Sequence, residues 1–228
     1  NYRREFLGNV SHELKTPIFN IQGYVHTLLD GAINDNLVNK KYLHRTSKSI
    51  DRLIAIIDDL DALARLESDE LKLEKTSWDI LDLIKEVFET FEVKSEKKNI
   101  ELILPKKKTP IMVLADRSQI NQVLYNLLSN GIKYGKESGF VKAFVQNKEN
   151  HIMITIQDNG IGIDEENIPR LFERFYRVDK GRSREEGGTG LGLAIVKHIL
   201  ETHNETIQVT SKKKSGTKFI FSIKKSKK

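Results

Sequence analysis

The spacing of apolar residues changes near residue 70, and this change constrains the fold more than any other feature of the chain. From residue 1 to about 68, apolar side chains recur every three or four positions, which is typical of amphipathic helices. The first stripe is Phe6, Val10, Leu14, Pro17 or Ile18, Ile21, Val25 and Leu28, and the second is Leu43, Ile50, Leu53, Ile57, Leu60 and Ala64. Turn-forming residues at 30–31 and 34–36 separate the stripes, so we expect an antiparallel helical hairpin.

A single hairpin cannot cover both of its apolar stripes well. Two copies can do so as a four-helix bundle, so the sequence predicts a homodimer in which residues 1–68 form the dimerisation domain. The alternative is a hairpin that packs against the rest of its own chain.

Residues 69–228 are predicted to form a second domain of mixed strands and helices. The predicted strands are 71–74, 100–104, 111–114, 140–146, 152–157, 206–210 and 218–223. The predicted helices are 79–97, a long helix capped by Asp116 with Gln119 as a capping-box partner, and 193–202. This order favours an α+β fold with an α/β sandwich over a parallel doubly wound sheet.

Composition excludes several classes of protein. The chain of 228 residues has no cysteine, which excludes a disulfide scaffold and a thiolate metal site. No apolar run approaches the roughly 20 residues that span a bilayer, and no secretory signal is visible. The net charge of +6 lies largely in short lysine runs, which we interpret as solvated turns rather than a surface for nucleic acid or anionic lipid. The chain starts at Asn1 rather than Met, as an excerpt would.

One histidine is expected to face water. At about 100° per residue, His12 falls roughly 160° from the centre of the first apolar stripe. Glu13 can approach Nδ1 of His12 and fix the tautomer that leaves Nε2 as a nucleophile, and Thr16 lies one turn along the same face. The alternative is an ordinary polar surface histidine.

Several polar and glycine-rich segments suggest a phosphate-binding pocket, although the chain has no Walker loop. Asn126, Asn130 and Lys133 share one helix face and can offer oxygens to Mg²⁺ and an ammonium to phosphate. Asp158 ends a predicted strand and can accept from the amine of adenine, while Gly160 and Gly162 allow close backbone approach. Each feature alone also fits plain surface polarity or a tight turn.

A second glycine-rich segment leads into the helix predicted at 193–202. Free N–H groups at that helix start suit phosphate oxygens, and the polar stretch before it is expected to be a mobile lid. The segment consists of Gly188, Thr189, Gly190, Leu191, Gly192 and Leu193.

Residues 6–17, FLGNVSHELKTP, resemble the phosphoacceptor motif of sensor histidine kinases. The resemblance implies that His12 is phosphorylated on nitrogen, that Glu13 is the base that activates it, and that Thr16 positions water for dephosphorylation of the partner.

Residues 126–134, 158–163, 172–176 and 188–193 resemble, in order, the motifs of the GHKL (Bergerat-type) ATP-binding domain. The resemblance implies that ATP and Mg²⁺ are the cofactors and that Asn126 ligates the metal. It assigns Asp158 to adenine, Arg177 to the γ-phosphate and Thr217 to the pocket margin. The implied phosphate and sugar contacts are Asn130, Lys133, Tyr134 and residues 188–193. The chain departs from the family pattern at Gly131, where Ala is usual, and at Asn204 and Lys214, where Gly is common.

Together the two resemblances imply a homodimeric kinase. It autophosphorylates His12, transfers the phosphoryl group to an aspartate in the receiver domain of a response regulator, and dephosphorylates that regulator. Residues 66–73 would be the hinge between the domains. The chain would be the cytoplasmic portion of a membrane-anchored sensor, with membrane contact only through segments absent from this chain. The rivals are an ATPase that drives a conformational clamp and a non-catalytic dimeric scaffold.

Overall fold

The computed structural model describes residues 2–67, 72–106, 109–178 and 188–226. The chain divides into two compact units. We call residues 1–67 with 174–191 the hairpin unit, and residues 68–173 with 192–228 the sheet unit. The predicted domain boundary and half of the predicted hinge fall at 68–71, and most of the predicted lid falls at 179–187, outside the described residues. In the described ranges, no helix has the length and apolar character needed to cross a bilayer.

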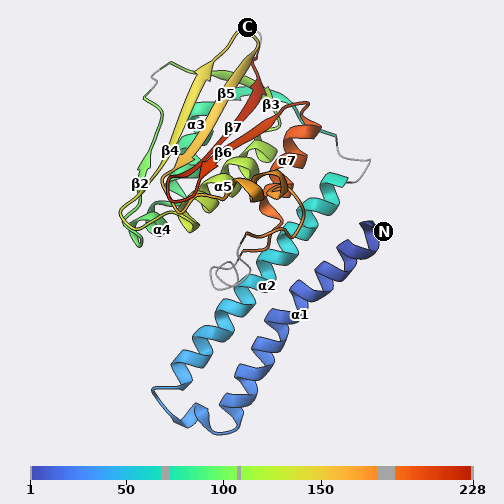
Figure 1. The fold of residues 1–228 in the computed structure, drawn as a ribbon, viewed down its shortest axis with the longest axis vertical. Helices are drawn as coiled ribbons and strands as arrows, with labels where there is room; N and C mark the ends of the chain where they lie inside the picture. The colour runs from blue at the N-terminus through green and yellow to red at the C-terminus, as the bar shows by residue number, and fades with distance from the viewer. Residues whose placement is uncertain (1, 68–71, 107–108, 179–187, 227–228) are drawn as a thin grey trace. The chain divides into compact units, whose positions relative to one another are not determined.

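Two long helices form the hairpin, as the sequence predicts. Helix α1 (Tyr2–Leu29) and helix α2 (Asn39–Glu67) run antiparallel and side by side (Figure 1). The turn between them contains a short 3₁₀ helix, η1 (Ala32–Asn34). Gly31 begins this turn with φ of 118°, a backbone conformation that side chains disfavour, which explains the glycine.

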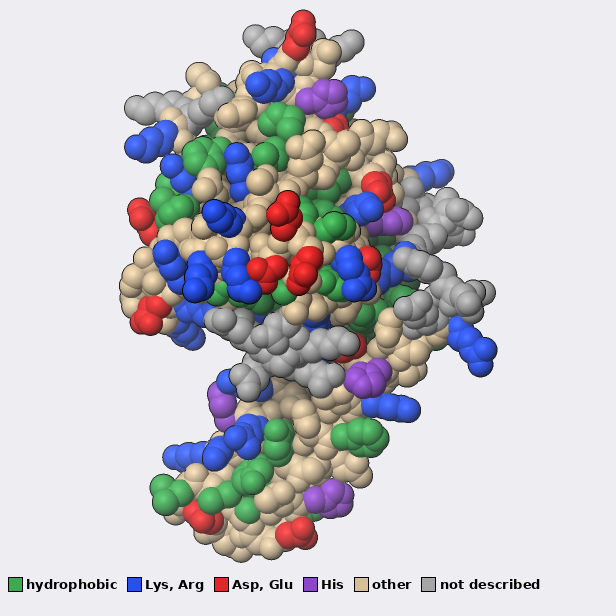
Figure 2. Space-filling model, viewed as in Figure 1, with side chains coloured by type: hydrophobic (Ala, Val, Ile, Leu, Met, Phe, Trp, Pro, Cys, Tyr) green, Lys and Arg blue, Asp and Glu red, His purple; other side chains and the backbone are tan. Residues whose placement is uncertain are grey.

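Helix α2 has two apolar faces rather than the one that the sequence predicts. Ile56 and Leu63 are buried, whereas Leu43, Ile50 and Ile57 are exposed. Several residues of the predicted second stripe thus lie on the outward face, which a second copy is predicted from the sequence to cover, whereas the inward positions Ile56 and Leu63 were not predicted. Figure 2 shows hydrophobic side chains on the hairpin surface.

The sheet unit is a two-layer α/β sandwich, in agreement with the predicted fold class. A five-stranded sheet has the order β2-β4-β5-β7-β6, and a separate two-stranded sheet pairs β1 with β3. The strands are β1 (Thr76–Asp79), β2 (Glu101–Ile103), β3 (Met112–Ala115), β4 (Phe140–Asn147), β5 (His151–Asp158), β6 (Ile207–Lys212) and β7 (Gly216–Lys224). The helices are α3 (Ile80–Glu89), α4 (Glu92–Glu96), α5 (Arg117–Lys133) and α7 (Gly192–Thr202), with the 3₁₀ helix η2 (Glu165–Arg170).

The helices α3, α5 and α7 lie against one face of the larger sheet (Figure 1). Alternate side chains of the strands point into this layer because the side-chain period of a strand is two. The buried strand residues include Val141, Ala143, Val145, Ile152, Ile154, Ile156, Phe219 and Phe221. Asp116 caps α5 by accepting from the backbone N–H groups of Ser118 and Gln119, as predicted. Gln119 Oε1 has no partner among the described residues, so the return half of the predicted capping box is not formed.

Two predicted elements near the start of the sheet unit were wrong. Residues 72–75 carry no strand, and the strand is β1, which pairs with β3. Trp78 decides this register because its ring is buried and its Nε1–H donates to the Ala115 carbonyl at 2.8 Å. The helix predicted over 79–97 is split into α3 and α4 by Thr90 and Phe91.

The departures from the family pattern fall at special backbone positions. Asn204 and Lys214 both adopt left-handed conformations, with φ of 61° and 65°. Glycine is common at such positions because it has no Cβ, and Asn tolerates them better than Lys. At Gly131, an added Cβ would lie 3.1 Å from Val141 side-chain carbons, so α5 and β4 pack closely there.

Candidate functional site

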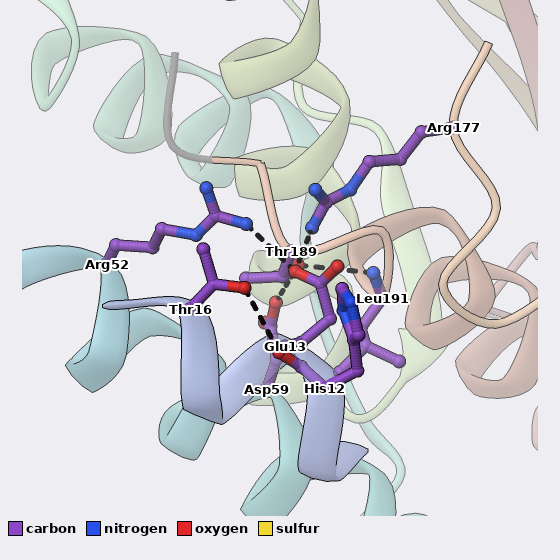
Figure 3. Close-up of polar contacts among 8 residues, drawn as sticks. All are labelled: His12, Glu13, Thr16, Arg52, Asp59, Arg177, Thr189 and Leu191. Carbon is purple, nitrogen blue, oxygen red and sulfur yellow. Dashed lines mark hydrogen bonds and ion pairs between the residues drawn. The ribbon is translucent and has the colours of Figure 1, made fainter. Parts of the chain in front are cut away.

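Helix α1 presents His12 to solvent. His12 is exposed, whereas Pro17 on the opposite side of α1 is buried, so the predicted orientation of the imidazole is confirmed. Figure 3 places His12, Glu13 and Thr16 on neighbouring turns of this helix. The imidazole of His12 is therefore accessible to another molecule without movement of the helix.

The carboxylate of Glu13 is held by two arginines. Its Oε2 accepts from Nη2 of Arg52, in α2, and from Nη2 of Arg177, in the segment that follows residue 173, both at 2.8 Å (Figure 3). In the described part of the chain no hydrogen bond joins Glu13 to His12, so the predicted contact with Nδ1 is not made in this arrangement. Sequence reasoning missed Arg52, because one arginine in a charged helix carries no distinguishing pattern.

The hydroxyl of Thr16 is engaged with the backbone. It donates to the His12 carbonyl at 3.2 Å, one turn earlier in the helix. A hydroxyl that donates keeps two lone pairs for accepting, so Thr16 can still accept a hydrogen bond from a water molecule. The threonine is half-buried and adjacent to the exposed histidine face.

A second polar contact joins α2 to the glycine-rich segment. The Thr189 hydroxyl donates to Asp59 Oδ2 at 2.5 Å and accepts from the Leu191 N–H at 3.1 Å. Burial raises the pKa of the Asp59 carboxyl, and the hydrogen bond from Thr189 opposes this rise. Asp59 lies two turns after Arg52 on α2, and the sequence did not single it out either.

In the sheet unit, Asp158 ends β5 with its carboxylate buried. Oδ1 accepts from the backbone N–H groups of Gly160 at 2.8 Å and Thr217 at 3.2 Å. Neither of these two bonds uses Oδ2. Burial raises the pKa of Asp158, although hydrogen bonds from backbone N–H groups, those of Gly160 and Thr217 among them, lower it. A buried carboxylate favours a ligand that donates a hydrogen bond over one that cannot.

Two glycines near Asp158 are required by close backbone packing. A Cβ on Gly160 would lie 2.3 Å from the Tyr134 carbonyl oxygen, and one on Gly162 would lie 2.0 Å from the Lys212 carbonyl oxygen. Gly162 also has φ of 66°. Any side chain at either position would push apart the strand end and the loop that surround Asp158.

The polar face of α5 lies beside the start of α7. Asn126, Asn130 and Lys133 are half-buried on one face of α5, and the opposite face is apolar and buried, as predicted. A Cβ on Gly192 would lie 3.3 Å from Asn126 Oδ1, so the amide adjoins the α7 N-terminus. Asn126 Nδ2 is buried and has no hydrogen-bond partner among the described residues. Rotation of the terminal amide exchanges the positions of O and N, so either atom can face a ligand.

The structure groups the predicted site residues into two sets. Asn126, Asn130, Lys133, Tyr134, Asp158, Gly160, Gly162, Gly192, Leu193 and Thr217 belong to the sheet unit. His12, Glu13, Thr16, Arg177, Gly188, Thr189, Gly190 and Leu191 belong to the hairpin unit. Arg177 is thus brought to Glu13. The Phe175 N–H donates to the Gly190 carbonyl at 2.8 Å, which ties the two ends of the segment together.

Two family models match the chain. Residues 2–69 match the His Kinase A (phospho-acceptor) domain. Residues 115–227 match the histidine kinase-, DNA gyrase B- and HSP90-like ATPase domain. The two matched regions contain all of the candidate site residues.

Individual relatives agree with these models. The sensor histidine kinase WalK of Bacillus subtilis (strain 168) is 35% identical over 223 residues, which is 97% of this chain and 36% of that protein. The solved catalytic domain of the histidine kinase ThkA is 33% identical, with a TM-score of 0.59 over 67% of this chain and 96% of its own. ThkA in complex with the response regulator protein TrrA is 29% identical, with a TM-score of 0.79 over 97% of this chain and 61% of that one.

Proposed function

This chain belongs to the sensor histidine kinases, and we propose that it uses ATP to phosphorylate its own His12 and passes the phosphoryl group to an aspartate of a response regulator. The observation that carries the proposal is the exposed His12 beside Glu13, whose carboxylate meets Arg177 from the segment next to the glycine-rich loop. A scaffold or a clamp ATPase would have no use for such a histidine. The chain spans only about a third of the WalK sequence.

The nucleotide is proposed to bind in the sheet unit around Asp158. Its carboxylate would accept from the exocyclic amine of adenine, and Gly160 and Gly162 would let the backbone approach the ring. Thr217, whose N–H already donates to Asp158, would line the margin of the pocket. Asp158→Asn should weaken ATP binding, since the loss of a charge-assisted bond costs on the order of 1–3 kcal/mol.

The phosphates are proposed to lie between the polar face of α5 and the start of α7. Asn130, Lys133 and Tyr134 would contact phosphate or sugar, together with the loop over residues 188–193. Backbone N–H groups at the start of α7 suit phosphate oxygens. Arg177 would leave Glu13 to contact the γ-phosphate when ATP binds.

The residues present fit a Mg²⁺ ion carried by the nucleotide. Nδ2 of Asn126 is buried and has no hydrogen-bond partner among the described residues, and an amide oxygen is an acceptable Mg²⁺ ligand beside phosphate oxygens and waters. When bound, the ion would neutralise charge on the phosphates. The described ranges hold no group of three or more His, Asp or Glu side chains that could bind a metal, so the nucleotide would supply most of the ligands.

The kinase is proposed to act as a homodimer built on the hairpin. Apart from Phe19, which points to another side of α1, the exposed large apolar side chains lie within about 40° of arc on α1 and about 60° on α2, at ~100° per residue. They are Leu7, Ile18, Val25 and Leu29 on α1, and Leu43, Ile50, Ile54 and Ile57 on α2. A second copy would cover these faces in a four-helix bundle. We further propose a position on the cytoplasmic side of a membrane-anchored sensor.

The opposed activities at His12 are proposed to depend on different neighbours. Glu13 would accept the imidazole proton during phosphorylation, and Thr16 would orient water for dephosphorylation of the regulator. Glu13→Gln should then slow autophosphorylation by about 10²–10⁴-fold and spare the phosphatase reaction. Thr16→Ala should do the reverse, while Thr16→Ser, which keeps the hydroxyl, should retain both. Parallel losses of both reactions in each variant would show that the residues only support the site.

A further inference from the structure

The side chain of Lys98 ends on the backbone of α5. Its Nζ donates to the Lys133 carbonyl at 2.8 Å and to the Ile132 carbonyl at 3.2 Å, and the residue is half-buried. Both carbonyls lie in the last turn of α5, where carbonyl groups have no partner within the helix. A cation also interacts favourably with the negative end of a helix dipole. Lys98 therefore caps the C-terminal end of α5 from a turn that precedes Ile132 by 34 residues.

The turn that carries Lys98 has contacts of its own. The Lys98 carbonyl accepts from the Ser138 N–H at 3.3 Å, and the Ile100 N–H donates to the Ser95 carbonyl at 2.9 Å. Ser95 and Ile100 are both buried. The ammonium is therefore placed by an anchored turn, so it can fix the end of α5 rather than follow it.

The end of α5 also holds the loop that follows Asp158. The Tyr134 carbonyl, directly after α5, accepts from the Ile161 N–H at 3.1 Å. Gly160 packs against the same carbonyl, and its own N–H donates to Asp158 Oδ1 at 2.8 Å. A shift of the last turn of α5 would therefore move Lys133, Tyr134 and the loop beside Asp158 together.

We propose that Lys98 is a positioning residue for nucleotide binding, which holds the last turn of α5, and with it Lys133 and Tyr134, in the position that the nucleotide meets. This inference rests on the proposed function, because it requires the nucleotide to bind around Asp158. Lys98 acts through the backbone of Ile132 and Lys133 and needs no contact with ATP.

The experiment titrates the whole 228-residue chain and its variants with ATP in the presence of Mg²⁺, and measures the KM for ATP and the maximal rate of autophosphorylation. Lys98→Met keeps the apolar stem and removes the ammonium. It should raise both the dissociation constant and the KM for ATP by about 10-fold, because the loss of a hydrogen bond from a charged donor has an effect of that order. The maximal rate should change little, because an interaction that contributes to substrate binding alone alters KM and leaves kcat unchanged. Lys98→Arg keeps the charge and several donors, so most of the affinity should return.

Two controls separate positioning from surface charge and from stability. Lys97→Met removes the neighbouring exposed cation and should leave ATP affinity unchanged. Ile152→Val shortens a fully buried side chain at the opposite end of β5 from Asp158, and should lower the melting temperature without weakening ATP binding. All titrations are made well below the lowest melting temperature. If Lys98→Met does not fold, Lys98→Gln, whose uncharged amide can still donate, replaces it and should also weaken ATP binding.

The outcomes are distinct. Weaker ATP binding in Lys98→Met that returns in Lys98→Arg and is absent from both controls supports the proposal. An equal loss in Lys97→Met or in Ile152→Val overturns it, because surface charge or stability would then explain the effect. Unchanged affinity in Lys98→Met beside weakened binding in Asp158→Asn overturns only this inference. Unchanged affinity in both of these variants overturns the proposed nucleotide site itself.

Discussion

The two units bury their apolar side chains to different extents. The sheet unit encloses a continuous set of fully buried residues between its helices and its sheet, including Leu124, Leu128 and Phe221. The hairpin unit has few buried side chains on its helices and leaves Leu7, Leu29 and other large apolar residues more than half exposed. A helix pair with an outward apolar face needs a second partner, whereas an enclosed core is complete in one chain. Stability in the sheet unit should therefore be a property of the monomer, and stability in the hairpin a property of the dimer.

The largest expected effect is in the core of the sheet unit. Leu128→Ala empties a fully buried position, which should lower the free energy of unfolding by about 2–5 kcal/mol. The loss should not depend on protein concentration. Leu43→Ala, at a position 55% exposed on α2, is the matched control and should cost far less when measured by urea unfolding at low concentration. Equal losses at the two positions would break the comparison.

The hairpin should respond to a charge on its outward face. Ile54→Asp places a carboxylate on the proposed dimer face, where burial of an unpaired charge is costly. We expect the dimer dissociation constant to rise by at least about 100-fold, since each 1.4 kcal/mol is a factor of ten. Sedimentation equilibrium measures this directly. Lys48→Asp puts the carboxylate on another face of the same helix and should leave the constant nearly unchanged; a monomeric wild type would contradict the dimer.

The pH dependence of stability should also differ between the two units, because His203, whose pKa is shifted by folding, belongs to the sheet unit. Burial lowers the pKa of His203, although its hydrogen bond to the Ile199 carbonyl raises it. Its Nε2 accepts from the Asp116 N–H at 3.1 Å, which requires the neutral ring. In the unfolded chain a histidine titrates near 6.5, so below about pH 6.5 the unfolded state binds more protons than the folded state. Stability should fall as pH decreases from about 6.5 towards the lowered pKa.

The measurement for His203 is the melting temperature of the sheet unit within the whole chain at pH 7.5 and 5.5. The wild type should lose stability at the lower pH by up to about 1.4 kcal/mol per unit. His203→Gln should start lower at pH 7.5 and lose less on acidification. The raised pKa values of Asp59 and Asp158 act in the opposite direction, because those carboxyls favour the fold when protonated, so their stabilisation fades as pH rises from about 3.8. An equal slope in wild type and variant would contradict the role of His203.

The smallest effect is expected at Lys214. Its left-handed backbone costs on the order of 1 kcal/mol for a residue other than glycine. Lys214→Gly should therefore raise the stability of the sheet unit by somewhat less than that, because glycine also gains entropy in the unfolded chain. Asn204→Gly, at a comparable φ, should gain less because Asn tolerates this conformation. A loss of stability at Lys214 would show that its side chain makes an unrecognised contribution.

Much of the fold follows from local patterns in the sequence. Helices α1, α2, α5 and α7 and strands β4 to β7 follow from periodicity and from residues such as Asp116, which caps α5 through bonds to its nearest neighbours. The register of β1 does not, because it depends on the hydrogen bond from the Trp78 ring to the carbonyl of Ala115, which is far away in the sequence. The double apolar face of α2 was also missed, because spacing alone does not tell which neighbour covers which side.

The candidate site divides in the same way. His12 was predictable because its exposure depends only on helical geometry. The position of Asp158 at a strand end was predictable as well, but its hydrogen bond from Thr217 joins residues far apart in the chain. Arg52 and Asp59 were invisible in the sequence, since their importance comes from Glu13 and Thr189, which only the folded chain brings to them.

The central claim is that His12 is the phosphoryl acceptor, and acid treatment of the labelled protein tests it most directly. The chain is incubated with γ-labelled ATP and Mg²⁺, and the bound label is measured before and after acid. The account predicts a label that acid removes, that is absent from His12→Gln, and that is lost in a variant whose ATP affinity is unchanged. A label that survives acid on Ser or Thr, or release of free phosphate with no labelled protein, would contradict it.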